Sequence, residues 1–148
     1  MIRAAARQDL DAIVALGKRM HSESPRYQRL VFDEAKVYAM FLNAMDDARY
    51  FLLVSETADG EITGGFAGFA AEHWCSRDTV AQDLALFVQP DRRGGLAAAQ
   101  MVKAFAAWAK ERGCKQIVLG ISTGVRVEET AQLFCALGLK QFGYCFEV

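Results

Sequence analysis

The residues with the clearest chemical meaning lie at 86–98, where the sequence reads LFVQPDRRGGLAA. A strand-like segment ends at Val88, Gly94 and Gly95 form a turn, and an alanine-rich helix is predicted to follow. The first N–H groups of a helix lack partners and lie at its positive end, so this arrangement favours an anion site. Glycine has no Cβ and lets a phosphate approach the backbone. The pattern also fits an ordinary glycine-containing turn, so both interpretations stay open here.

Acidic residues in or beside apolar segments are the candidate proton acceptors. Asp83 lies in VAQDLALFV, where an unpaired carboxylate is costly to bury, so it is either a general base or a structural hydrogen-bond acceptor. Glu72 ends the preceding strand-like segment and is a second candidate base, although exposed carboxylates are common at strand ends. Tyr144, in the last predicted strand, is a third candidate catalytic residue, and a core tyrosine is its simpler interpretation.

The histidines and cysteines form no recognisable cluster. His21 and His73 have no partners at metal-ligand spacing, so no metal site is predicted. No cysteine pair has C-x-x-C spacing, which favours free thiols in a reducing compartment, and the expected location is cytoplasmic. Cys135 and Cys145 suggest an acyl-cysteine relay, but no nearby His-Asp pattern supports one, so inert buried thiols are expected.

Hydrophobic periodicity and turn signals predict the elements that position these residues. Helices are expected from about Asp9, after Asp33 as N-cap, and over 96–112 and 127–137. Short turns make the three middle strands antiparallel, and the strand–helix–strand segment 80–121 favours a parallel pair. The predicted class is α+β, with a mixed, largely antiparallel sheet between helices on both faces. Its strands are expected at 2–5, 49–56, 62–73, 80–88, 115–121, 139–142 and 144–148.

The segment Arg92–Ala97 reads R-x-x-G-x-A, and neither a Walker loop nor a dinucleotide fingerprint is present. It resembles the [Q/R]-x-x-G-x-[G/A] signature that the GNAT superfamily of N-acetyltransferases carries at the same strand-to-helix junction. The order of elements is similar over nearly the whole chain. Residues 133–139 (LFCALGL) also look like the family's Y-x-x-x-G-F segment.

This resemblance implies acetyl-CoA as co-substrate and a sheet of about seven strands that splays between the fourth and fifth. It implies that the backbone around Phe87 and Val88 pairs with the pantetheine arm, and that Arg92 adds positive charge to the turn. The pyrophosphate would be held by the backbone amides of Arg93, Gly94, Gly95, Ala97 and Ala98. Family members catalyse direct attack of a bound amine on the thioester. The acceptor site would combine residues 21–31, 72–74 and the tail hairpin, with Glu23 and Glu34 available to attract a cationic amine.

Two positions depart from the family pattern. The tyrosine thought to protonate the departing thiolate corresponds to Phe134, and a frequent asparagine seven residues earlier corresponds to Val127. These differences leave the general acid unassigned, while the fold and the cofactor interpretation stay the same.

Length and charge exclude several other classes of protein. The chain has 148 residues, 53% of them hydrophobic, which predicts one ordered domain over 1–148. Its 17 basic and 18 acidic residues give a net charge of −1, so no nucleic-acid partner is expected, and no apolar run suggests a membrane span. The sequence favours an N-acetyltransferase acting on a small-molecule or peptide amine, as a monomer or homodimer. The alternatives are a non-catalytic acyl-CoA-binding or sensor domain, and a scaffold domain that binds nothing.

Overall fold

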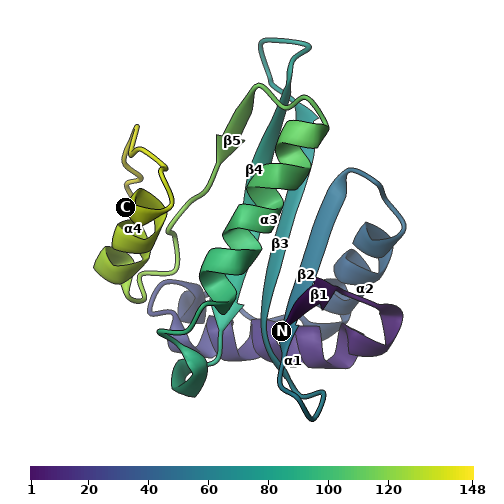
Figure 1. The fold of residues 1–148 in the computed structure, drawn as a ribbon. Helices are drawn as coiled ribbons and strands as arrows, with labels where there is room; N and C mark the ends of the chain where they lie inside the picture. The colour runs from purple at the N-terminus through teal and green to yellow at the C-terminus, as the bar shows by residue number, and fades with distance from the viewer.

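The computed structural model describes residues 1–148 as one five-stranded sheet with four α-helices (Figure 1). The strands follow the order β1-β2-β3-β4-β5; the first four are antiparallel, and β5 runs parallel to β4. The strands are β1 (Ile2–Ala4), β2 (Tyr50–Glu56), β3 (Ile62–Glu72), β4 (Thr79–Val88) and β5 (Gln116–Val118). The helices are α1 (Leu10–Glu23), α2 (Glu34–Met45), α3 (Ala97–Glu111) and α4 (Val127–Ala136). No helix has the length and apolar character that crossing a bilayer requires.

The class α+β and the mixed, largely antiparallel sheet are confirmed, but the expectation of about seven strands is wrong. Residues 139–148 form no strand, and the apolar side chains of Phe142, Tyr144 and Phe146 are 79–93% exposed. The alternating pattern of this tail is typical of a strand, but a strand also needs a neighbouring edge to pair with. Tyr144 is therefore not a core tyrosine.

The helices cover both faces of the sheet because each has one apolar side. Asp33 caps α2 as predicted: its carboxylate accepts a hydrogen bond of 2.9 Å from the Lys36 N–H. On one face of the sheet, α3 buries Met101, Val102, Phe105 and Ala109. On the opposite face, α1 and α2 pack together (Figure 1).

Two glycines in β3 mark close approaches between neighbouring elements. A Cβ at Gly68 would lie 2.6 Å from Cε2 of Phe105, so only glycine lets α3 approach the sheet this closely. A Cβ at Gly64 would lie 2.9 Å from the Phe87 carbonyl oxygen of the neighbouring strand.

A β-bulge changes the facing of side chains along β4. Gly68 pairs with Asp83 and Ala67 pairs with Ala85, which leaves Leu84 as an extra residue. Ala81 and Val88 both belong to the core beneath α3, although seven residues separate them and a regular strand would place them on opposite faces. The bulge accounts for this, and it increases the local bend beside Asp83.

The sheet opens between β4 and β5 as expected. Their parallel pairing covers only three residue pairs, the last of which is Gln82 with Val118. Beyond that point the chain after β5 diverges toward α4, and the edge of β4 from Asp83 to Val88 has no strand beside it (Figure 1). The splay therefore starts at Asp83.

Candidate active site

A cavity of about 330 Å³ occupies the opening between the two strands. One wall is β4 and the turn that leads to α3, and the other is residues 120–134, including the start of α4. Met20, Glu23 and Tyr27, from the end of α1 and the following loop, complete the lining. This volume lies within the range of small-molecule sites.

The α3 end of the cavity presents a row of free backbone donors. None of the N–H groups of residues 94–99 has a hydrogen-bond partner, and no side chain caps the helix. Gly94 has a φ of +86°, a left-handed conformation that favours glycine, and space is open around the position of its missing Cβ. Free amides and the positive helix end suit an anion such as a pyrophosphate. Gly94, Gly95, Ala97 and Ala98 all line the cavity.

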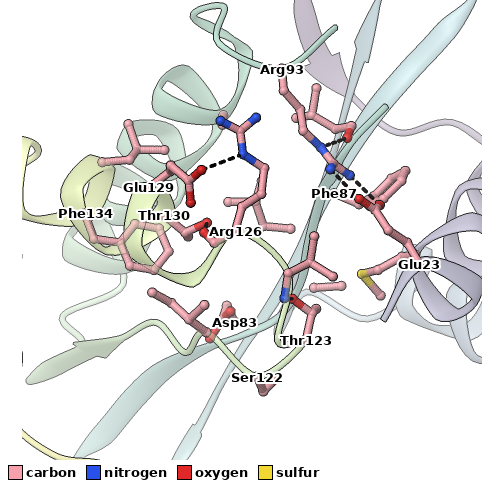
Figure 2. A pocket seen from close by; sticks show the side chains of 18 of the residues that line it. Glu23, Asp83, Phe87, Arg93, Ser122, Thr123, Arg126, Glu129, Thr130 and Phe134 are labelled. Carbon is pink, nitrogen blue, oxygen red and sulfur yellow. Dashed lines mark hydrogen bonds and ion pairs between the residues drawn. The ribbon is translucent and has the colours of Figure 1, made fainter. Parts of the chain in front are cut away.

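The two arginines of the turn differ in role. Arg92 is half-exposed and has only Asp91 nearby, at 3.6 Å, so its charge is available at the mouth of the cavity. Arg93 is held by its neighbours: its two Nη atoms donate to the two oxygens of Glu23 at 2.5 Å, and its Nε donates to the Val88 carbonyl at 2.9 Å (Figure 2). The guanidinium also lies 5.4 Å from the centre of the Phe87 ring. Arg93 holds the wall together, because three of its five guanidinium N–H groups bond to Glu23 and Val88.

The exposed edge of β4 can pair with an extended ligand. The Gln89 N–H donates to the Thr63 carbonyl of β3. Because the backbone N–H and C=O groups of successive strand residues point to alternate sides, those of Phe87 also point toward β3. Leu86 and Val88 therefore direct their N–H and C=O groups into the opening. Since Arg93 takes the Val88 carbonyl, the free groups are the Val88 N–H and both backbone groups of Leu86.

Asp83 lies at the apex of the splay and lines the cavity. Its Oδ1 accepts a hydrogen bond of 2.8 Å from the Gly120 N–H across the gap. Burial raises the pKa of the Asp83 carboxyl, and the Gly120 hydrogen bond opposes this only in part. No cationic side chain pairs with it, so one oxygen remains available to take a proton. The structural hydrogen bond considered for Asp83 is present, and Asp83 also lines the cavity, where its role as general base stays a prediction.

The α4 wall contains Phe134 and two charged residues. Phe134 is 8% exposed and joins the core beneath α3 while also lining the cavity (Figure 2). Arg126, directly before α4, has a left-handed backbone with φ of 46°, and its side chain pairs with Glu129 at 3.3 Å. Val127 does not line the cavity. The sequence predicted a helix over 127–137 here, but no pattern in it pointed to Arg126, Glu129 or Thr130 as site residues.

Several residues considered from the sequence lie elsewhere. Glu72 is exposed at the end of β3, and neither it nor Tyr144 lines the cavity. Of the expected acceptor region, Glu23 and Tyr27 line the cavity but residues 72–74 and the tail do not. The carboxylate of Glu23 is occupied by Arg93, and that of Glu34 pairs with Lys18 at the surface, 3.1 Å away.

Cys135 and Cys145 were expected to be buried, but the structure exposes both. Cys75, Cys135 and Cys145 are exposed, Cys114 is partly buried, and none of the four lines the cavity. The structure therefore offers no cysteine beside the reacting groups.

The sequence model of the Acetyltransferase (GNAT) family matches residues 17–136, which include the splayed strands, the turn and α4. The chain belongs to this family. The resemblance seen in the residues 92–97 motif is thereby confirmed. No curated protein sequence matches the chain at a significant level.

Solved structures of GNAT acetyltransferases share the whole fold at low sequence identity. AAC(6')-Iy in complex with the bisubstrate analog CoA-S-monomethyl-acetylneamine is 18% identical with a TM-score of 0.80, over 100% of this chain and 95% of that one. A predicted acetyltransferase with acetyl-CoA from Clostridium acetobutylicum is 17% identical with a TM-score of 0.76, over 100% and 94%. Glucosamine-6-phosphate N-acetyltransferase from Arabidopsis thaliana is 14% identical with a TM-score of 0.76, over 100% and 96%.

Proposed function

We propose that this GNAT protein is an N-acetyltransferase that moves an acetyl group from acetyl-CoA to a primary amine by direct attack. One observation carries the proposal: the unpaired amides at the start of α3 and the partly buried carboxyl group of Asp83 open onto the same cavity. The anion site follows the end of β4 and the proton acceptor lies midway along it, which matches the needs of a thioester donor that carries phosphates.

The residues present fit the co-substrate. The free N–H groups of Gly94, Gly95, Ala97 and Ala98, with the charge of Arg92, would hold the pyrophosphate, whereas the Arg93 N–H already bonds to the Pro90 carbonyl. The Val88 N–H and the backbone of Leu86 would pair with the amides of the pantetheine arm, much as an added strand pairs with a sheet edge. This places the contacts one residue away from Phe87, whose backbone faces β3.

In the proposed reaction the amine nitrogen forms a bond to the thioester carbon, and the carbon–sulfur bond breaks. The amine loses one proton to the Asp83 carboxylate, directly or through water, and the sulfur takes one from water. A carboxyl with a raised pKa is a better proton acceptor than an ordinary one, which suits this role. Thiols have a pKa of about 8.5, so the sulfur can leave without a dedicated acid.

Acetyl-CoA binding is the first test of the proposal. Acetyl-CoA at about 100 times its dissociation constant adds ~2.7 kcal/mol of stability, so the melting temperature should rise by about 5–10 °C. Gly95→Asp should abolish this shift by repelling the pyrophosphate, and since an added Cβ meets nothing closer than 3.7 Å the fold should survive. Gly143→Asp, with the same charge in the open tail, is the matched control. An unchanged melting temperature for the wild-type protein contradicts the proposal.

A non-catalytic acyl-CoA sensor is the second candidate, and Phe134 favours it. This side chain faces the cavity where the resemblance led us to expect a tyrosine hydroxyl. Release of free CoA thiol with a panel of primary amines separates the two: turnover supports the enzyme, and binding without turnover supports the sensor.

A further inference from the structure

We infer that residues Glu23–Tyr27, which we call the strut, set the width of the opening between β4 and β5 and so position the acetyl donor. The sheet cannot do this, because the last backbone pair of the two strands is Gln82 with Val118. Beyond that pair the Asp83–Gly120 hydrogen bond joins the two walls at one point, and the strut adds further connections. The inference rests on the proposed function for its catalytic consequence.

The strut holds the β4 wall through one ion pair. Glu23 is the last residue of α1, and both of its oxygens accept from Arg93, which in turn holds the final carbonyl of β4 at Val88. Arg93 is 17% exposed and Glu23 is 28% exposed, so water screens this pair less than it screens surface ion pairs. Arg93 is held from three directions, by Glu23, Val88 and the Phe87 ring.

The next residues hold the opposite wall. Ser24 is completely buried; its hydroxyl donates to the Thr123 carbonyl at 2.5 Å and accepts from the Tyr27 N–H at 3.0 Å. The Tyr27 hydroxyl lies 2.8 Å from Oγ of Ser122. Arg26 donates to the Ser122 carbonyl at 3.1 Å. These bonds fix residues 122–123, which follow Gly120, the partner of Asp83.

Consecutive residues of one short segment thus hold both walls. Figure 2 shows Glu23 and Arg93 on one side of the cavity and Ser122 and Thr123 on the other. Loosening either attachment should let residues 120–123 move relative to β4. This would change the distance from Asp83 to a thioester held by the α3 amides. The strut residues are positioning residues, because none of them needs to touch the reacting atoms.

Glu23→Gln and Ser24→Ala test the strut, with Asp46→Asn as matched control. Asp46 also binds an arginine through both oxygens, at 2.6 and 2.7 Å from Nη2 of Arg7, and neither residue lines the cavity. Amide hydrogen exchange of residues 119–125 should become about tenfold faster in both strut variants and stay unchanged in the control. Tyr27→Phe, which removes only one hydroxyl, serves if Ser24→Ala fails to fold.

Binding and kinetics give the second readout. We expect the strut variants to bind CoA about tenfold more weakly by calorimetry and to lower kcat, while the control stays within twofold. In the double variant, the loss of CoA affinity and of kcat should be smaller than the product of the losses in the two single variants, because both changes act through the same displacement. Unchanged exchange at 119–125, or a uniform rise across β2 and β3 with CoA affinity and kcat within twofold, would overturn the inference. If the wild-type protein binds no CoA, the proposed function fails, and hydrogen exchange alone still decides whether the strut holds the walls.

Discussion

Asp83 combines a structural bond with a free carboxylate oxygen, and this makes it the residue on which activity should depend most. Asp83→Asn keeps the shape and can still accept the Gly120 N–H, but it cannot take a proton. We expect kcat to fall by about 10²–10⁴-fold, the usual contribution of a general base. The measurement is CoA thiol release at saturating substrates.

The pH profile and a control variant make this prediction specific. Since burial raises the Asp83 pKa, the acidic limb of kcat/KM should lie above the range of an ordinary carboxyl and should disappear in the Asn variant. The raised pKa also means that ionised Asp83 opposes folding at neutral pH, so Asp83→Asn should cause no loss of thermal stability. Glu72→Gln, outside the cavity, should keep full activity. Near-normal turnover of the Asn variant would remove Asp83 from the mechanism.

Phe134 offers a test of the missing hydroxyl. Phe134→Tyr places an O–H at the cavity wall, and we expect turnover to be retained or increased, because a nearby donor can protonate the departing sulfur. Tyr144→Phe should have no effect, since Tyr144 is 79% exposed and lies outside the cavity lining. Activity that exists only in Phe134→Tyr would support the sensor interpretation. Strong inactivation by Phe134→Tyr would show instead that this position packs against the core or substrate.

At the scale of elements, the contact between β3 and α3 has the tightest fit. Gly68→Ala would place a methyl group against the Phe105 ring, which is completely buried and cannot move without disturbing the core. We expect a loss of about 1–3 kcal/mol, or a fall in melting temperature of roughly 2–12 °C. Gly143→Ala, where space is open and φ is not positive, should change stability by no more than about 0.5 kcal/mol. Equal melting temperatures for the two variants would contradict this packing argument.

The sequence correctly predicted the elements that carry strong local signals. It failed for elements whose formation depends on pairing with a segment distant in the sequence. Asp33, the apolar stripe of α3 and the glycines at 94 and 95 gave α2, α3 and the turn correctly, because each signal acts within a few residues. The pattern of residues 139–148 predicted strands that do not form, since pairing depends on an edge that local sequence does not describe.

The residues of the candidate site likewise fall into those that the sequence predicted and those that it did not. The amides of the turn follow from the motif, and Asp83 was recognisable as a charge in an apolar strand. The Arg93–Glu23 pair joins residues 70 positions apart, and the Ser24–Thr123 bond joins residues 99 positions apart, so no spacing in the sequence indicated either contact. The exposure of Glu72 likewise depends on where the hairpin ends, which periodicity alone does not give.

For the whole molecule, acid should weaken the attachment of the N-terminal strand. Asp9 is 5% exposed and accepts from two Nη atoms of Arg3 at 2.7 and 3.0 Å. The Arg3 hydrogen bonds lower the Asp9 pKa below its unfolded value of about 3.9, so this pair stabilises the fold above that pH and is lost as pH falls through the folded pKa.

Asp9→Asn should therefore cost about 1–3 kcal/mol at pH 7 and progressively less as the pH falls below about 4. Urea unfolding at several pH values measures the difference between variant and wild type. Asp46→Asn, in an exposed ion pair, should cost at most about 1 kcal/mol. A difference for Asp9→Asn that stays constant with pH would show that the carboxylate charge is not what matters.

The bulge at Leu84 also predicts where relatives of this chain can gain or lose residues. Removing Leu84 would invert the facing of every side chain after it, turning Phe87 toward α3 and Val88 away from it. The same deletion would reverse which backbone groups of β4 face the opening. The amides before α3 and the carboxylate of Asp83 could then no longer contact the same ligand. Length changes should therefore accumulate in the exposed hairpin turns 57–61 and 73–78, whereas the distance along β4 from Asp83 to Gly94 should be inherited unchanged.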